Sequence, residues 1–312
     1  MRNSIDQPIK RNKVHSEVEN ERRRRPISMK IVFAVAFIIF CIYAAYILFF
    51  FLFGLIIALK ADKDTYSIEY LSHSLFTFKT SNLNFGNFVD VFTRWEEYTD
   101  VSYFEMVWNS VWRTIVMTFV NWMCTSLVCY VLVHYKNRLT KFIYDFGLFI
   151  SMIPLYGAGA AEYRLFSQLN FINSPLIYIT QISLFGSNFF YMYAFWKSIS
   201  WEYGEASLID GASHWGTFWK VMFPMVLPSS ISLFIMLFIG NWNDYSYTNL
   251  YMQAYPDLSY GIYALKEQFT YKGYDMPLYY SGFIISFIPI LILFVCFQNT
   301  IMEKVYLGGL KG

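Results

Sequence analysis

A few polar side chains stand inside otherwise apolar stretches of the sequence, where they could recognise a polar solute. They are Asn188, Asn241, Asn243, Asp244 and Tyr247. Amides and carboxylates bond hydroxyl groups, and a tyrosine ring stacks on the apolar face of a sugar. The same side chains also join neighbouring helices inside a membrane. The residue types therefore indicate either a solute pathway or contacts between helices, and the sequence leaves both open.

The sequence shows no constellation of reactive groups. It lacks a Gly-x-x-x-x-Gly-Lys-Ser/Thr phosphate loop, a His-Glu-x-x-His zinc motif and a Gly-x-Ser-x-Gly elbow. Its four cysteines fall in or beside apolar runs without metal-ligand spacing. We therefore expect no catalytic residue, no metal and no cofactor, and any ATP-driven work must come from another subunit.

One stretch between two long apolar runs is too polar to cross a bilayer, and it reads EASLIDGASHWGTFWKVMFPMVLP from Glu205 to Pro228. It predicts two short helices. The first covers about residues 201–210 and ends at Gly211, since glycine suits the left-handed conformation after a helix. Ser213 can cap the second helix. Glu205 is expected in the last turns of the first helix, where the dipole disfavours an acid and a basic partner is implied.

The second short helix carries an apolar stripe with helical spacing, formed by Trp215, Phe218, Trp219 and Met222. Such a stripe is available to a partner subunit or to the protein's own interior, and a surface helix lying on a membrane would show it as well. Pro224 and Pro228 are expected to interrupt the chain on its way back into the membrane.

The composition points to an integral membrane protein. The chain has 312 residues, of which 56% are hydrophobic and only 15% charged. Apolar runs predict about six spanning helices. They cover roughly residues 31–59, 104–133, 142–161, 176–196, 229–249 and 278–297.

The distribution of basic residues predicts the orientation in the membrane. Residues 1–30 are rich in Lys and Arg, and the short loop with Lys136, Arg138 and Lys141 is basic, so both should be cytoplasmic. The positive-inside rule explains the basic tail without nucleic acid as a partner. We expect both termini in the cytoplasm, residues 60–103 outside the cell, and lipid around the spans.

The order of residues in the central loop resembles a known family. Glu205-Ala206-Ser207, then Gly211 after three residues, then Val221-Met222-Phe223-Pro224 after nine, resembles the EAA loop of ABC importer permeases. Ser207 stands where the family has a second alanine, and Phe223 where it commonly has leucine.

The resemblance extends over about residues 104–312. Asn109-Ser110 resembles the start of the family's second helix, Pro154 a proline in its third, and Trp242-Asn243-Asp244 a motif in its fifth. Residues 308–312, Gly-Gly-Leu-Lys-Gly, look like the C-terminal signature of the carbohydrate-type, MalG-like permeases of bacteria.

The resemblance implies a fold, partners and a division of roles. It implies an all-α membrane protein with the MetI-like permease fold, a second homologous permease, two cytoplasmic ATPase subunits and an extracellular solute-binding protein. The loop 198–228 would be the coupling segment that docks into the ATPase. Its expected coupling residues are Glu205, Ala206, Ser207, Asp210, Gly211, Ala212, Trp215, Phe218 and Pro224.

The resemblance also divides the chain into regions. They are a basic tail (1–30), a first helix with an extracellular segment (31–103), a permease core (104–298) and a cytoplasmic tail (299–312). The implied function is import of an oligosaccharide or related solute into a bacterial cell across its plasma membrane. A glycerophosphodiester or polyol is the alternative cargo, and a membrane-embedded transferase or scaffold is the alternative from another class.

Overall fold

The computed structural model describes residues 27–60, 83–153, 159–180, 182, 185–272 and 275–308. The chain divides into two compact units, residues 1–56 and 57–312. Most of helix α2 (Ile27–Ala58) belongs to the first unit. Its apolar side chains are exposed over Met29 to Leu52, as expected of a helix that is hydrophobic all round and faces lipid.

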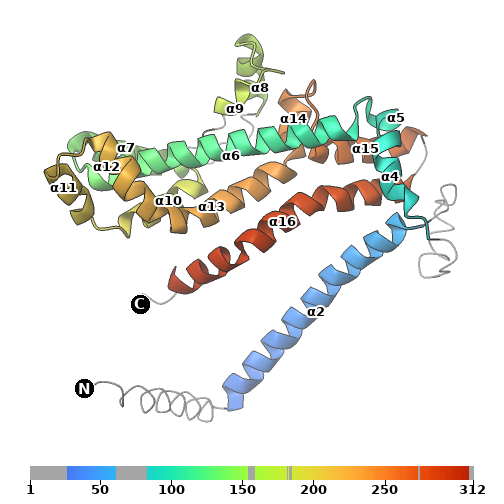
Figure 1. The fold of residues 1–312 in the computed structure, drawn as a ribbon, viewed down its shortest axis with the longest axis horizontal. Coiled ribbons are helices and arrows are strands. Elements are labelled where there is room, and N and C mark those ends of the chain that lie inside the picture. The colour runs from blue at the N-terminus through green and yellow to red at the C-terminus, as the bar shows by residue number, and fades with distance from the viewer. Residues whose placement is uncertain are drawn as a thin grey trace, which may run out of the picture. The chain divides into compact units, whose positions relative to one another are not determined.

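The elements of regular structure described in the second unit are helices (Figure 1). The helices before the central loop are α4 (Gly86–Arg94), α5 (Glu96–Thr99), α6 (Tyr103–His134), α7 (Arg138–Ser151), α8 (Gly159–Gln168), α9 (Ile177–Thr180) and α10 (Ser187–Lys197). Those that follow are α11 (Glu202–Ile209), α12 (His214–Thr217), the π-helical turn η2 (Phe218–Met222), α13 (Phe223–Asn243), α14 (Tyr245–Tyr251), α15 (Leu258–Lys272) and α16 (Met276–Gly308).

Helix α6 is the central element of this unit, because α10, α13 and α15 all pack against it (Figure 1). Two tryptophans tie its neighbours to it. The indole of Trp122 donates to the Ser230 carbonyl at 3.0 Å, and that of Trp196 donates to the Ser126 hydroxyl at 3.1 Å. Buried indole N–H groups need such partners, so these bonds fix how α10 and α13 lie on α6.

Within the described part of the chain, four helices are long and apolar enough to cross a membrane. They cover Met29–Ala58, Tyr103–His134, His214–Asn243 and Met276–Gln298. The third expected span corresponds to α7 and α8, and the fourth to α9 and α10, each too short to cross alone. Pro154 and Gly157 of the third lie outside the described residues.

The fifth expected span, 229–249, is interrupted. Helix α13 ends at Asn243, Asp244 has an extended backbone, and α14 starts at Tyr245. The expectation that Asp244 lies within a continuous helix is therefore wrong. Its carboxylate caps α14 by accepting from the backbone N–H groups of Ser246 (3.0 Å) and Tyr247 (3.3 Å). Aspartate stabilises helix starts in this way, which favours the break.

The expected interruption at the prolines is also wrong. The chain is helical without a gap from α12 through η2 to the end of α13. Pro224 occupies the first turn of α13, where a missing N–H costs least, and Pro228 lies inside the helix. The helix widens to a π turn at Phe218–Met222, just before Pro224, where the Phe223 backbone N–H donates to the Phe218 carbonyl. Membrane helices tolerate proline in such settings.

The segment after the first helix packs on the last one. Helix α4 lies against α16, and Arg94 pairs with Asp275 at 2.9 Å, next to the start of α16. Trp95 is fully buried against Gly282, where an added Cβ would come within 2.3 Å of the indole. The close approach of ring and backbone is therefore possible only because residue 282 is glycine.

Candidate functional site

The central loop forms two helical arms joined by a tight turn. Helix α11 ends at Ile209, and Gly211 adopts a φ of 86°, the left-handed conformation expected from the sequence. The Ser213 hydroxyl accepts from the Gly216 N–H at 3.1 Å and so caps α12, again as expected. The first short helix, the turn at Gly211 and the Ser213 cap are therefore as expected, whereas the second helix is not short, because it continues through η2 into α13.

A buried pair of hydroxyl groups locks the two arms together. The Ser207 and Thr217 hydroxyl oxygens are 2.6 Å apart, and both side chains are buried. The backbone N–H of Ala212 adds a bond to the Ser207 carbonyl at 3.0 Å. Ser207, which departs from the alanine of the EAA pattern, therefore has a specific partner on the other arm.

The apolar stripe of the second arm is divided between two environments. Phe218 and Met222 are buried in a cluster with Tyr130 and Trp196, so they anchor the loop to the protein's own interior. Trp215 is 60% exposed. Of the two uses left open by the sequence, the protein's own interior takes Phe218 and Met222, while Trp215 remains exposed.

The first arm carries the exposed part of the loop. Glu205, Ala206 and Asp210 are exposed, and Ile209 shows 85% of its surface. Glu205 is the fourth residue of α11, which starts at Glu202, and therefore lies in the first turn of this helix. The expectation of an unfavourable position in the last turns is wrong, and the helix dipole here favours the acid.

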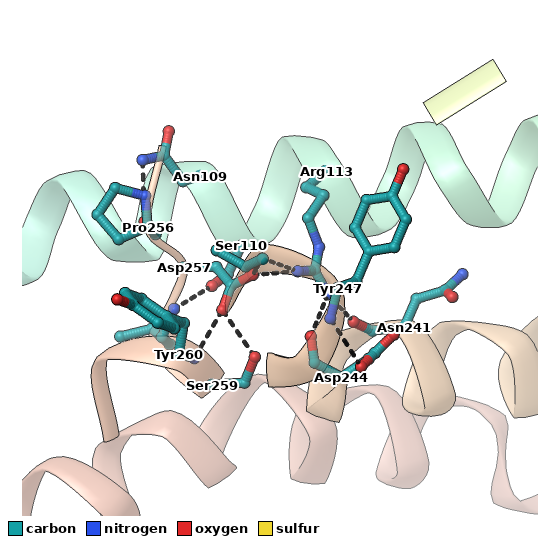
Figure 2. A network of polar contacts seen from close by, with 12 residues as sticks. Asn109, Ser110, Arg113, Asn241, Asp244, Tyr247, Pro256, Asp257, Ser259 and Tyr260 are labelled. Carbon is teal, nitrogen blue, oxygen red and sulfur yellow. Dashed lines mark hydrogen bonds and ion pairs between the residues drawn. The ribbon is translucent and has the colours of Figure 1, made fainter. Parts of the chain in front are cut away.

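A second polar site lies where α6, α13, α14 and α15 meet, around the buried side chain of Arg113 (Figure 2). Arg113 is ten residues into α6, or about 15 Å from its first residue. Its guanidinium donates to the Asp257 carboxylate and to the Thr248 hydroxyl. It also donates to the backbone carbonyls of Asn241 and Asp244, the latter at 3.0 Å.

The guanidinium therefore serves two purposes at once. It neutralises the buried Asp257, and it satisfies carbonyl groups that α13 leaves open where it ends. The other oxygen of Asp257 accepts from the Ser259 hydroxyl at 2.7 Å and from the Tyr260 N–H at 2.8 Å. A buried charge pair persists only when such additional bonds complete it.

The residues at the start of α6 extend this network. The Ser110 hydroxyl accepts from the Leu258 N–H at 2.7 Å, and the Asn109 amide donates to the Pro256 carbonyl at 3.0 Å (Figure 2). Asn109, Ser110 and Arg113 together fix the connection between α14 and α15 on α6.

The structure gives the predicted pathway residues different surroundings. The Asn241 amide donates to the Thr118 hydroxyl at 3.0 Å, and the buried Tyr247 hydroxyl donates to the Ile177 carbonyl at 3.2 Å, so both join helices. Asn243 is exposed and its amide donates to Ile239 on its own helix. Asn188 is half-buried near the start of α10, away from the others in the fold.

Sequence reasoning missed Arg113 and Asp257. A single arginine inside the apolar run 104–133 was the available signal, since a charge at that depth needs a partner. Asp257 falls between expected spans, so nothing in the pattern linked it to Arg113, 144 positions earlier.

The model of the family described as "Binding-protein-dependent transport system inner membrane component" matches residues 22–305. The chain belongs to this family. This confirms the resemblance, the helical permease fold and the location in a membrane. Permeases of this family are non-catalytic subunits, which excludes the transferase alternative.

Alignments with individual relatives span most of this chain. The chain is 28% identical over 241 residues to an arabinooligosaccharides transport system permease protein, AraQ, of Halalkalibacterium halodurans; the alignment covers 75% of this chain and 82% of the relative. It is 25% identical to the melibiose/raffinose/stachyose import permease protein MelC of Bacillus subtilis, covering 93% and 100%. A bacterial ABC transporter involved in import of the acidic polysaccharide alginate has a chain of the same fold, with a TM-score of 0.67, 18% identity, and 88% and 98% coverage.

Proposed function

We propose that this permease forms half of the translocation pathway of an ATP-powered importer for a neutral oligosaccharide. Two of the sequence relatives, AraQ and MelC, are named for oligosaccharide cargo and support this class of solute. The membership of the family supports delivery by a binding protein. A second homologous permease would complete the pathway, and two ATPase subunits would drive it.

We further propose that the central loop couples the permease to the ATPase. The observation that carries this is the division of the loop into an anchored arm and an exposed arm. Phe218 and the Ser207–Thr217 pair fasten the loop internally, while Glu205, Ile209 and Asp210 stand exposed. A segment that conveys motion between subunits needs internal contacts that hold its shape and an exposed surface for a partner. The internal bonds and the exposed first arm of this loop support that role.

The coupling proposal retains the residues expected from sequence and refines their roles. Contact with the ATPase is assigned to the exposed residues Glu205, Ala206, Asp210 and Gly211 and to the half-buried Ala212 beside them. Ser207 and Phe218 hold the arms in place, Trp215 lies at the exposed rim, and Pro224 follows in the first turn of α13.

Transport by the purified complex tests the importer function. The complex, with its partner permease and ATPases, is placed in proteoliposomes with its binding protein, and uptake of labelled raffinose and arabinotriose is measured. We expect accumulation of at least one neutral sugar that requires both ATP and the binding protein. Mass spectrometry identifies the ligand that the purified binding protein carries, and this ligand is then tested for uptake beside the two labelled sugars. Uptake of neither sugar, together with a bound ligand of another class, would contradict the assignment.

A further inference from the structure

A small cavity lies between α13, α15 and α16, with a volume of about 160 Å³. Its wall is mainly apolar and is formed by Trp242, Leu258, Ile262 and Phe283. Its polar rim consists of Asn243, Ser259 and Ser286. A small set of polar groups on an apolar wall is the usual composition of a site for a small molecule.

The rim offers hydrogen-bonding capacity suited to hydroxyl groups. The Ser259 hydroxyl donates to Asp257 and the Ser286 hydroxyl donates to the Phe283 carbonyl, both at 2.7 Å, so each has used its hydrogen and keeps acceptor lone pairs. The Asn243 amide donates one hydrogen to Ile239 and, among the described residues, makes no other hydrogen bond with its side chain. The rim thus accepts from hydroxyl donors, and Asn243 also has a hydrogen to give.

No charged residue lines the cavity. The Asp257 carboxylate, which accepts from the lining residue Ser259, is neutralised by Arg113 and is 1% exposed. An anionic or cationic solute would find no opposite charge among the residues lining this cavity. A neutral polyhydroxy compound suits it, since its hydroxyls meet the rim and its C–H face meets the apolar wall.

Arg113 holds the two main parts of the rim in place. Asn243 lies between residues 241 and 244, whose carbonyls accept from the guanidinium, and Ser259 is bonded to the carboxylate that the same guanidinium pairs with (Figure 2). The positions of the end of α13 and the start of α15 therefore both depend on one side chain of α6, that of Arg113.

We propose that this cavity is a hydroxyl-binding subsite for a neutral sugar, reached from the aqueous pathway, and that Arg113 is its positioning residue. The proposal rests on the importer function but predicts accessibility that can be measured without a transported solute.

Thiol labelling of the full complex in proteoliposomes tests access. The four native cysteines, at 41, 124, 129 and 296, are replaced by alanine. Asn243→Cys and Ser259→Cys are then compared with Met236→Cys, which is also on α13, is 64% exposed and does not line the cavity. The probe is 2-(trimethylammonium)ethyl methanethiosulfonate, which is charged and needs an aqueous thiolate. We expect both cavity positions to react at least about tenfold faster than position 236. Equal slow labelling at all three positions would overturn the proposal, because the cavity would then face lipid.

Transport kinetics test hydroxyl binding, with raffinose as the probe. Asn243→Ala should raise KM by roughly three- to tenfold, the effect of losing one or two hydrogen bonds, without lowering kcat as much. Gln253→Ala, an exposed amide on the α14–α15 connection, is the matched control. An unchanged KM for Asn243→Ala overturns the subsite. If the wild type does not transport raffinose at all, the proposed function fails for this sugar while the labelling result remains decisive for access.

The role of Arg113 is tested with Arg113→Lys, which keeps the charge but removes the fork that reaches carboxylate and carbonyls together. In the Asn243→Cys background, Arg113→Lys should change the rate of thiol labelling by about threefold or more. With Asn243 intact, Arg113→Lys should raise KM for raffinose. Arg94→Lys, in the partly exposed pair with Asp275, is the control and should change neither. Wild-type labelling and KM in Arg113→Lys would overturn the positioning role.

Discussion

The hydroxyl oxygens of Ser207 and Thr217 lie 2.6 Å apart and join the two arms of the central loop across the turn at Gly211. Thr217 is fully buried and Ser207 is 9% exposed, so water cannot replace this bond. The position that departs from the alanine of the EAA pattern is thereby matched by a threonine ten residues later. This pair and the buried Phe218 hold the two arms in a fixed arrangement relative to each other.

A double-mutant cycle should reveal the pair. Ser207→Ala leaves the Thr217 hydroxyl buried and without its partner, which should cost about 1–3 kcal/mol of stability. Ser207→Ala with Thr217→Val removes both hydroxyls while keeping the volume, and should recover most of that loss. The measurement is the apparent melting temperature of the purified complex, with the exposed Ser198→Ala as control. A double variant less stable than either single variant would argue against the pairing.

Gly211 should be sensitive to backbone conformation and not to side-chain size. Its φ is 86°, and an added Cβ would meet nothing within 4 Å, so space is available. Gly211→Val should therefore cost about 1–2 kcal/mol through strain alone and should lower ATP hydrolysis stimulated by loaded binding protein. Gly211→Asn is the control, since asparagine tolerates the left-handed region and should retain most of the stimulation. Equal loss in both variants would show that the contact with a partner needs the bare glycine.

Glu205 should matter to the ATPase contact and little to the permease itself. Reversing its charge at an exposed first turn costs only about 0.3–1 kcal/mol of helix stability. Glu205→Lys should nevertheless reduce the ATPase recovered when the permease is purified through an affinity tag. Glu202→Lys, in the same turn and also exposed, is the control for dipole and surface charge. Similar recovery of ATPase with both variants would remove Glu205 from the interface.

Local chemistry at the central loop was predictable from sequence. The left-handed Gly211, the Ser213 cap and the short helix α11 follow from preferences that act over a few residues. The bounds of α11 were also predictable, since the helix was expected over about residues 201–210 and covers Glu202–Ile209. The error concerned Glu205 alone, which is the fourth residue of this short helix and lies in its first turn, although it was expected in the last turns. Burial of Phe218 but not Trp215 was hidden from the sequence, because periodicity defines a face without saying what covers it.

Contacts between distant segments were the larger gap. Apolar runs located the long helices, but hydropathy does not show that Asp244 caps a new helix and ends α13. The pairing of Arg113 with Asp257 depends on how α6 and α15 lie in the fold, and a single sequence carries no such information. Residues 308–312 resemble a family tail that reaches the ATPase dimer. Residues 309–312 lie outside the described part of the chain, so a contact of this tail with the ATPase stays a prediction.

The orientation in the membrane can be measured with single cysteines in a cysteine-free background. Asp100→Cys and Asp210→Cys replace exposed residues, one after α5 and one at the turn of the central loop. We expect a membrane-impermeant thiol reagent to label position 100 in intact cells and position 210 only after permeabilisation, as the basic short loops predict. Labelling of position 210 from outside would rule out coupling to a cytoplasmic ATPase.

The buried Arg113–Asp257 pair should be costly to break and cheaper to remove completely. Arg113→Met leaves Asp257 without its counter-charge at a site where it is 1% exposed, and loss of one partner in such a pair costs about 3–5 kcal/mol. Arg113→Met with Asp257→Leu eliminates both charges and should restore part of the melting temperature, but not all, because the carbonyls of Asn241 and Asp244 still lose their donor. Arg94→Met is the control: the Arg94 side chain is 26% exposed, so water can partly replace it beside Asp275, and the loss of stability should be smaller than for Arg113→Met. A double variant as unstable as Arg113→Met would mean that capping the end of α13, and not charge neutralisation, is the main contribution of Arg113.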